Sequence, residues 1–217
     1  DQALALLLSC VRGVAYKDRA VRAGRWNVHK EVPTHRIAGR TLGLVGYGAI
    51  ARCLHRKTSG FGLARVLAAD PFVKPEAIRA AGAEPASLET LLRESDYVSV
   101  HVPLGPETKG MIGARQLGLL KPTAILVNTS RGPVVDEKAL AATLGARRIA
   151  AAGLDVFETE PLDAASPLRK LENVVLSDHA GWYSEESVPE LKTKAARNVA
   201  AVLAGGRPAY PVNTITR

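Results

Sequence analysis

The stretch that decides the fold is Gly43-Leu-Val-Gly46-Tyr-Gly48-Ala-Ile-Ala51, which lies between a short apolar run and a segment with helical spacing. Glycines in this order between a strand and a helix are typical of a dinucleotide site, where a pyrophosphate lies at the helix N-terminus. Gly46 would make the tight turn, and Gly48 would let the backbone approach the phosphates. Ala51 replaces the third glycine, at a position that needs only close helix–strand packing.

Asp70 strengthens this prediction, because it ends the next strand-like segment, RVLAAD. Its offset from the turn is near the value of about 20 residues at which an acid accepts hydrogen bonds from the ribose hydroxyls. A carboxylate at this point repels a 2′-phosphate, so NAD is the predicted cofactor rather than NADP. The alternative is that the glycines and the aspartate are ordinary turn formers.

Strand-like and helix-like segments alternate after residue 40. The strand-like segments are short and nearly all apolar, as expected where helices cover both faces of a sheet; they are residues 41–46, 65–70, 97–102, 124–130, 149–156 and 173–179. Helical spacing occupies residues 49–60, 74–82, 87–95, 114–120, 136–148 and 187–206. This alternation predicts an α/β fold, a doubly wound parallel sheet of the Rossmann type, in one domain over residues 25–217.

The composition is that of an ordinary globular protein, with 47% hydrophobic and 23% charged residues among 217. Cys10 and Cys53 form neither a disulfide framework nor a metal-binding spacing, so we expect a cytoplasmic protein with no metal. No apolar run reaches the roughly 18 residues of a membrane helix. The net charge is +8, but the Lys and Arg residues are scattered, so neither a nucleic acid nor a membrane is an expected partner.

Met111 is the only methionine, and the sequence opens directly into a helical pattern over residues 1–24. We therefore expect a fragment or an excised domain.

Candidate site residues follow the predicted strands at their carboxyl ends. They are Val102 with Pro103 beside His101, the run Asn128-Thr129-Ser130-Arg131-Gly132, then Asp155, Glu160 and His179. Ligands of open α/β sheets bind beyond these ends, so we expect the residues to share one edge with the glycine turn.

The segments NTSRGPVVDEKAL and LDVFETEPL, followed by the strand and His179, occur in this order after the glycine turn and HVPLGPET. Over nearly the whole chain this set resembles the NAD-binding domain of the D-isomer-specific 2-hydroxyacid dehydrogenases. The segment HAGWYSEES resembles most the branch that contains the C-terminal-binding proteins. The resemblance implies an NAD-dependent oxidoreductase that acts on a 2-oxo or 2-hydroxy acid.

The resemblance also implies a role for each site residue. Arg131 would hold the substrate with paired hydrogen bonds, and His179 would donate the proton in reduction and accept it in oxidation. Glu160 would pair with His179, orient its ring and favour its charged form. Asp155 would face the nicotinamide end of the cofactor. Trp182 would line the substrate pocket or, equally, pack as a core or dimer aromatic.

The cofactor would contact the glycine turn and the strand ends. The residues that the resemblance implies are Gly46, Tyr47, Gly48, Ala49, Ile50, Asp70, Val102, Pro103, Thr108, Thr129, Ser130, Arg131, Asp155, His179 and Gly181.

Each site residue has a simpler structural alternative. Arg131 is then a surface arginine at a helix entry, Asp155 and Glu160 are turn residues, and His179 caps a loop. Glu158 is a nearby competitor for the role of Glu160.

One departure from the family concerns the residue before the histidine. The family usually has Thr-Pro-His, whereas this chain has Ser177-Asp178-His179. Asp178 adds a second carboxylate near the ring, which leaves open whether Glu160 alone pairs with it.

The family also has a second, smaller domain formed by sequence before and after this part. We therefore expect the chain to bind NAD but to be weakly active or inactive alone. Residues 1–24 resemble the arm through which such proteins dimerise. The apolar face of that segment would be costly to expose, which predicts a homodimer; its residues are Leu4, Leu7, Leu8 and Val11.

A second class of function is an NAD-sensing interaction protein, like the corepressors of the C-terminal-binding branch. The presence of Arg131, Glu160 and His179 together favours the enzyme, because a scaffold has no need of all three.

Overall fold

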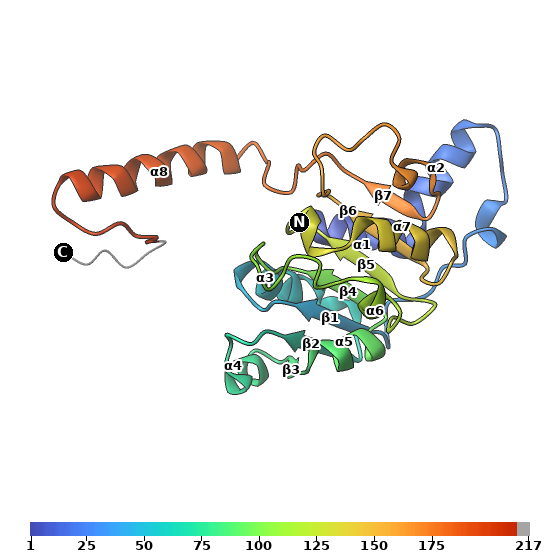
Figure 1. Cartoon of the computed structure of the whole chain (residues 1–217), viewed down its shortest axis with the longest axis horizontal. Helices are drawn as coiled ribbons and strands as arrows, with labels where there is room; N and C mark the ends of the chain where they lie inside the picture. Colours follow the sequence, from blue (N-terminus) through green and yellow to red (C-terminus); the bar gives the residue numbers. More distant parts are fainter. Residues whose placement is uncertain (212–217) are drawn as a thin grey trace. The chain divides into compact units, whose positions relative to one another are not determined.

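A sheet of parallel strands forms the centre of the computed structural model, which describes residues 1–211 (Figure 1). The strand order in this part of the chain is β3-β2-β1-β4-β5-β6-β7, and every pair is parallel. The strands are β1 (Thr41–Val45), β2 (Arg65–Ala69), β3 (Glu84–Pro85), β4 (Tyr97–Val100), β5 (Ile125–Asn128), β6 (Ala151–Leu154) and β7 (Val174–Leu176). The predicted doubly wound sheet is confirmed.

The helices alternate with these strands as predicted from residue 49 onward. They are α3 (Ala49–Thr58), α4 (Pro75–Ala80), α5 (Leu88–Glu94), α6 (Ala114–Leu117), α7 (Glu137–Gly145) and α8 (Ser187–Leu203), with 3₁₀ turns η1 (Val28–Lys30), η2 (Ser59–Phe61), η3 (Gly132–Val134) and η4 (Pro167–Lys170). Strand β3 was not predicted, because it is only two residues long and carries no periodic signal.

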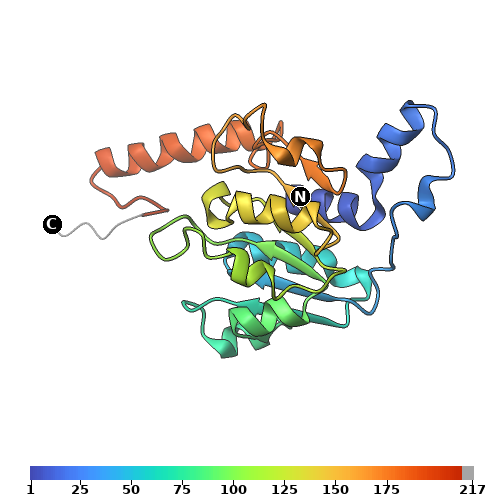
Figure 2. The same cartoon turned by 45° about the vertical axis from the view of Figure 1, so that its right-hand side comes forward.

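Helices cover both faces of the sheet (Figures 1 and 2). Successive strand side chains point to opposite faces, so Leu44 packs with α3 while its neighbour Val45 packs in a second cluster with α5 and α7. Both faces of the sheet thus carry a hydrophobic cluster, and this explains why the strand sequences show no regular polar alternation.

The predicted single helix over residues 1–24 is wrong, because the structure has two helices there. Gly13 adopts a left-handed conformation (φ 59°) that ends α1 (Gln2–Arg12) before α2 (Val14–Arg22) begins. The sequence pattern missed this break because apolar spacing continues across it.

The apolar face of α1 packs in part within the same chain. Of the residues predicted to form this face, Leu7 and Val11 are buried as α1 packs on β5, β6 and β7, whereas Leu4 and Leu8 are half-buried. The homodimer stays a prediction.

The chain divides into two compact units, Asp1–Gly181 and Trp182–Arg217. The first contains the sheet and both α1 and α2. In the second, α8 follows a turn in which the Ser187 hydroxyl donates a hydrogen bond to the Trp182 carbonyl at 2.8 Å. The division predicted between residues 24 and 25 stays a prediction.

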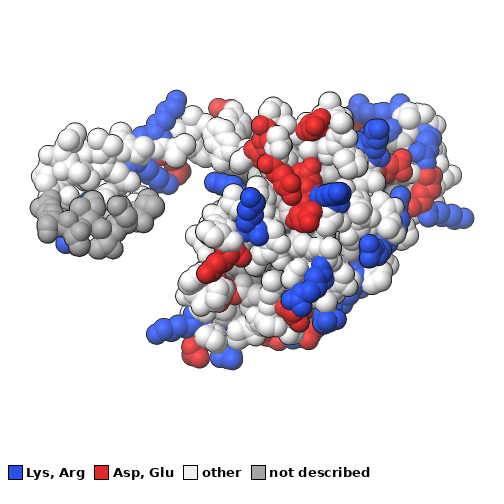
Figure 3. All heavy atoms as spheres, in the orientation of Figure 1, with Lys and Arg blue, Asp and Glu red and all other residues white. Residues whose placement is uncertain are grey.

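Charged side chains are mixed on the surface. On the face shown in Figure 3, Lys and Arg are interspersed with Asp and Glu rather than gathered in one stripe. None of the helices in residues 1–211 combines the length and the apolar character needed to traverse a bilayer.

We predict that Leu6→Ala lowers the free energy of unfolding by about 2–5 kcal/mol, because it leaves a cavity between α1 and the sheet. Leu6 is 4% exposed, and its Cβ lies against Gly153 of β6. The matched control is Leu203→Ala, at a side chain that is 83% exposed, and its expected effect is within about 0.5 kcal/mol. Urea unfolding followed by circular dichroism measures both, and equal effects would show that α1 is not part of the core.

Candidate active site

The glycine turn lies between β1 and α3, where the strand order changes direction between β1 and β4. Gly46 has φ 85°, and a Cβ there would come within 3.0 Å of the His101 carbonyl, so both conformation and space require glycine. Beside Gly48, by contrast, a Cβ would meet nothing within 4 Å. No side chain caps α3, so the N–H groups of its first turn have no partner within the helix. The turn therefore fits an incoming phosphate.

Asp70 holds the turn together from the end of β2. Its Oδ2 accepts a hydrogen bond from Tyr47 N at 2.7 Å, and its Oδ1 accepts one from Phe72 N at 2.9 Å. A carboxylate has about four lone-pair sites, so it can still accept from ribose hydroxyls. The carboxylate thus shapes the turn and also stands at the predicted ribose position.

Tyr47 was predicted to contact the cofactor, but its side chain points into the core. The ring is fully buried, and its hydroxyl is hydrogen-bonded to His55 Nδ1 at 2.8 Å. Burial raises the pKa of Tyr47. Because its N–H is also engaged by Asp70, Tyr47 contributes to the shape of the turn.

The other residues predicted to contact the cofactor before residue 110 lie at the start of α3 and in the loop after β4. Ala49 and Ile50 are exposed at the start of α3. After β4, the Thr108 hydroxyl donates to the Pro103 carbonyl at 2.6 Å and accepts from Gly105 N at 2.8 Å. These two bonds close the loop that follows Val102.

Asn128 organises the loop that carries Arg131. Its Oδ1 accepts from Ser130 N at 3.0 Å and from the Ser130 hydroxyl at 2.8 Å, and its Nδ2 donates to the Arg131 carbonyl at 3.1 Å. Asn128 is buried, whereas Arg131 is exposed and its Nη1 donates a hydrogen bond to the Ser130 carbonyl at 2.7 Å. The sequence analysis assigned no role to Asn128; a buried amide at a strand end is the signal that would have found it.

Gly132 brings the Arg131 loop against the loop that carries Glu160. A Cβ at Gly132 would lie 1.9 Å from the carbonyl of Phe157. Only glycine permits this approach, so the two loops pack backbone to backbone.

His179 and Glu160 form the closest polar pair of the site. His179 Nδ1 lies 2.6 Å from Glu160 Oε2, while Glu160 Oε1 accepts from Phe157 N at 3.0 Å. Partial burial pushes the pKa of Glu160 upward, but the hydrogen bonds from His179 and Phe157, together with the charges of His179 and Arg131, hold that pKa below its ordinary value. An ionised carboxylate only accepts, so His179 Nδ1 carries the proton and donates it to Glu160 Oε2.

The pairing of Glu160 with His179 resolves two alternatives that the sequence left open. Glu158 instead exchanges hydrogen bonds with Glu137 at the start of α7: Glu158 Oε1 accepts from Glu137 N at 2.9 Å, and Glu137 Oε2 accepts from Glu158 N at 3.1 Å. Asp178 is exposed. The His179 Nδ1 therefore takes Glu160 as its carboxylate.

Asp155 is buried at the end of β6, with 1% of its surface exposed. Its Oδ1 accepts from the Ser177 hydroxyl at 2.6 Å and from Ala180 N at 3.1 Å, and its Oδ2 accepts from Gly181 N at 2.8 Å. The carboxylate thus anchors the His179 loop, a contact that the sequence did not predict. Gly181 was predicted to contact the cofactor, but its N–H donates to Asp155 Oδ2.

Trp182 belongs to the second unit, so its predicted place in the substrate pocket stays a prediction. Its ring is 59% exposed and packs edge-on against Tyr183, with the ring centroids 5.6 Å apart.

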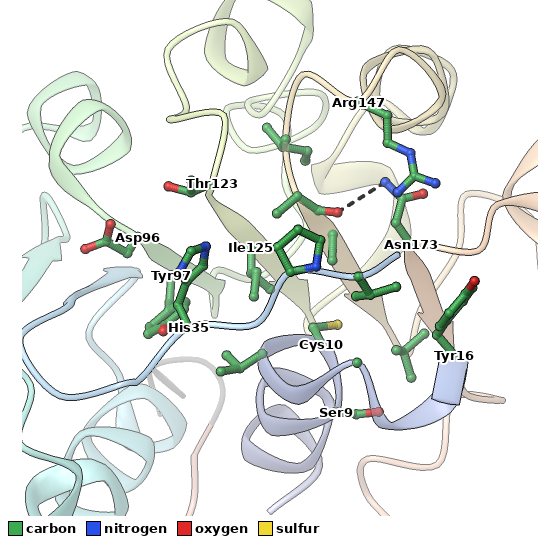
Figure 4. Close-up of a pocket in the computed structure, with 18 of the residues that line it drawn as sticks. Ser9, Cys10, Tyr16, His35, Asp96, Tyr97, Thr123, Ile125, Arg147 and Asn173 are labelled. Atoms are coloured by element: carbon green, nitrogen blue, oxygen red, sulfur yellow. Dashed lines mark hydrogen bonds between the residues drawn. The ribbon is translucent and has the colours of Figure 1, made fainter. Parts of the chain in front are cut away.

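A cavity of about 400 Å³ lies at the opposite edge of the sheet (Figure 4). Its walls include Tyr97, Ile125 and Ala151, the first residues of β4, β5 and β6. Cys10 also faces it, and burial raises the pKa of this thiol to about 12. This cavity is therefore separate from the edge that carries the glycine turn.

The structure brings Arg131, Glu160 and His179 together, as the carboxyl ends of parallel strands require. Within residues 1–211 no group of three or more His, Cys, Asp and Glu side chains is placed to hold a metal ion. Fold and site together define a dinucleotide-binding α/β domain that carries a histidine–carboxylate pair and an arginine beside the nucleotide turn.

Comparisons with known proteins agree with this class. Residues 4–181 match the family described as D-isomer specific 2-hydroxyacid dehydrogenase, NAD binding domain. The chain belongs to this family, and its cofactor is NAD.

The chain is similar to two archaeal glyoxylate reductases that are longer than it is. A glyoxylate reductase of Korarchaeum cryptofilum is 47% identical over 216 residues, which cover 98% of this chain and 65% of that protein. A glyoxylate reductase of Thermococcus litoralis is 44% identical over 220 residues, covering 98% of this chain and 66% of that protein. The chain thus spans about two thirds of the length of these relatives.

Among solved structures, the apo form of Rhodotorula graminis D-mandelate dehydrogenase superposes with a TM-score of 0.90 at 35% identity, covering 99% of this chain and 64% of that one.

The resemblance to the branch of the C-terminal-binding proteins is not supported. The relatives at 47% and 44% identity are glyoxylate reductases, so the His-Ala-Gly-Trp segment does not assign the branch. The alternative of an NAD-sensing interaction protein rested on that resemblance, so it is no longer supported.

We predict that Gly132→Ala separates the Arg131 and Glu160 loops, because the new methyl group would overlap the Phe157 carbonyl. The expected loss in the free energy of unfolding is about 1–3 kcal/mol. Gly60→Ala is the matched control, since a Cβ there meets nothing within 4 Å, and it should change stability by no more than about 0.5 kcal/mol. If both variants melt at the native temperature, the backbone contact at Gly132 is not as tight as described.

Proposed function

We propose that this chain serves an enzyme that transfers a hydride between NAD(H) and a small 2-oxo or 2-hydroxy acid. The observation that carries the proposal is the 2.6 Å pair between His179 Nδ1 and Glu160 Oε2, on the sheet edge that also carries the glycine turn. When bound, NADH supplies the hydride. The residues of the chain have to bind and orient the acid and deliver a proton.

His179 is the proposed acid and base. With Nδ1 held by Glu160, Nε2 carries a proton in the imidazolium form and a lone pair in the neutral form. It can therefore protonate the alkoxide that develops on the substrate carbon during reduction, and take that proton back during oxidation. Glu160 fixes the orientation of the ring through the hydrogen bond to Nδ1.

Arg131 is the proposed substrate-binding residue. The residue is exposed after the end of β5, and its charge acts on Glu160. A planar guanidinium grips a carboxylate and a neighbouring carbonyl with two parallel hydrogen bonds. Arg131 would thus orient the 2-oxo group toward His179 and polarise the carbonyl.

Glyoxylate is the substrate that we propose to test first. Two relatives that share 44% and 47% identity with this chain are named glyoxylate reductases, and glyoxylate is the smallest 2-oxo acid. Pyruvate and hydroxypyruvate differ only in the group beyond the carbonyl, so they complete the panel. We further propose, on the resemblance alone, that the enzyme is a cytoplasmic homodimer.

We predict that His179→Gln leaves NADH affinity within about twofold and slows glyoxylate reduction by about 10²- to 10⁴-fold, since the general acid is lost. The measurement is single-turnover loss of NADH fluorescence at high protein concentration. The matched control is His29→Gln, an exposed histidine on η1, which should behave as the native chain does. If the native chain reduces glyoxylate at a measurable rate and His179→Gln does so equally fast, His179 has no part in the mechanism.

The chain alone is expected to bind NADH and to turn over weakly or not at all, because relatives of this family use a longer sequence. Steady turnover of any of the three acids at the ordinary enzymatic rate of about 10 s⁻¹ would contradict this expectation.

A further inference from the structure

Gln2, in the first turn of α1, reaches the loop that carries His179. Its Nε2 lies 2.9 Å from the Ser177 hydroxyl and 3.4 Å from Asp155 Oδ1. These partners are 175 and 153 residues away along the chain. The amide therefore links helix α1 to the ends of β6 and β7.

The direction of each hydrogen bond in this network follows from the groups present. The Asp155 carboxylate accepts only, so the Ser177 hydroxyl must spend its single proton on Asp155 Oδ1, at 2.6 Å. The oxygen of Ser177 is then an acceptor, and Gln2 Nε2 is the donor that faces it. Removing the Gln2 amide leaves the Ser177 hydroxyl oxygen without its donor. Asp155 Oδ1 also loses its contact with Gln2 Nε2.

The same carboxylate holds His179 in an unusual backbone conformation. His179 has φ 58°, which is costly for a residue with a side chain. The turn directs the next two N–H groups, those of Ala180 and Gly181, at Asp155, with distances of 3.1 and 2.8 Å. The position of the His179 ring thus depends on the orientation of the Asp155 carboxylate as well as on Glu160.

We infer that Gln2 is a positioning residue for His179. Its amide fixes Ser177 and Asp155, and Asp155 in turn holds the N–H groups that keep the His179 loop in its left-handed turn. Helix α1 is thereby part of the site although no residue of α1 has a place in the proposed chemistry. The consequence for proton transfer rests on the proposed function, whereas the link between Gln2 and the loop does not.

The test compares Gln2→Met with Gln116→Met. Methionine keeps the length of glutamine but removes the donor, and Gln116 is a partly buried glutamine on α6, away from this edge. Amide hydrogen exchange is measured by NMR for Ala180 and Gly181, with Val127 in β5 as the internal reference. We expect exchange at Ala180 and Gly181 to be at least about tenfold faster in Gln2→Met, and unchanged at Val127. Gln116→Met should exchange as the native chain does at all three.

Ser177→Ala removes the same link from its other side and is expected to give the same pattern at the two amides. In the Ser177→Ala background, Gln2→Met should add little, because both substitutions break one network. Single-turnover glyoxylate reduction should slow about tenfold in Gln2→Met with NADH affinity retained, since small misplacements of an acid are costly.

Native exchange at Ala180 and Gly181 in Gln2→Met would overturn the inference, and so would an increase that Val127 shares. The exchange readout needs neither cofactor nor substrate. If the two amides respond as expected while native protein reduces no 2-oxo acid, the proposed function fails and the positioning role of Gln2 stands.

Discussion

The site depends on the hydrogen bonds that the carboxylate of Asp155 accepts where it is buried at the end of β6. A buried charge of this kind requires donors, and here the donors are the Ser177 hydroxyl and two consecutive N–H groups of the His179 loop. The need to satisfy the carboxylate therefore folds the loop. Asp70, after β2, likewise accepts from Tyr47 N in the glycine turn, and Asn128, the last residue of β5, accepts from Ser130 N.

The parallel order of the strands turns these separate loops into one site. Because all strands end at the same edge, the glycine turn after β1 and the loops after β5, β6 and β7 meet there. Gly132 then lets the Arg131 loop touch the backbone of the Glu160 loop. The resulting arrangement gives His179 a fixed Nδ1 partner, and the function proposed above assigns Nε2 to reversible proton transfer.

The sequence predicted the sheet well because its strands are buried on both faces and its glycine motif occurs in one structural context. Each predicted strand and each helix from residue 49 onward is present. The break at Gly13 was missed because left-handed backbone leaves no trace in apolar spacing. The sequence favoured Glu160 as the partner of His179 but left Glu158 and Asp178 open as competitors, since spacing along the chain does not give the direction of a side chain. The hydrogen bonds of Gln2 could not be predicted for a related reason, because its partners Asp155 and Ser177 are more than a hundred residues away along the chain.

The central claim is that this edge of the sheet is built for NAD, with Asp70 at the ribose. Calorimetric titration of the native chain with NADH and, separately, with NADPH tests it most directly. The account predicts saturable binding of NADH that is at least about tenfold tighter than that of NADPH, because the Asp70 carboxylate repels a 2′-phosphate. No heat with NADH, or tighter binding of NADPH, would contradict it.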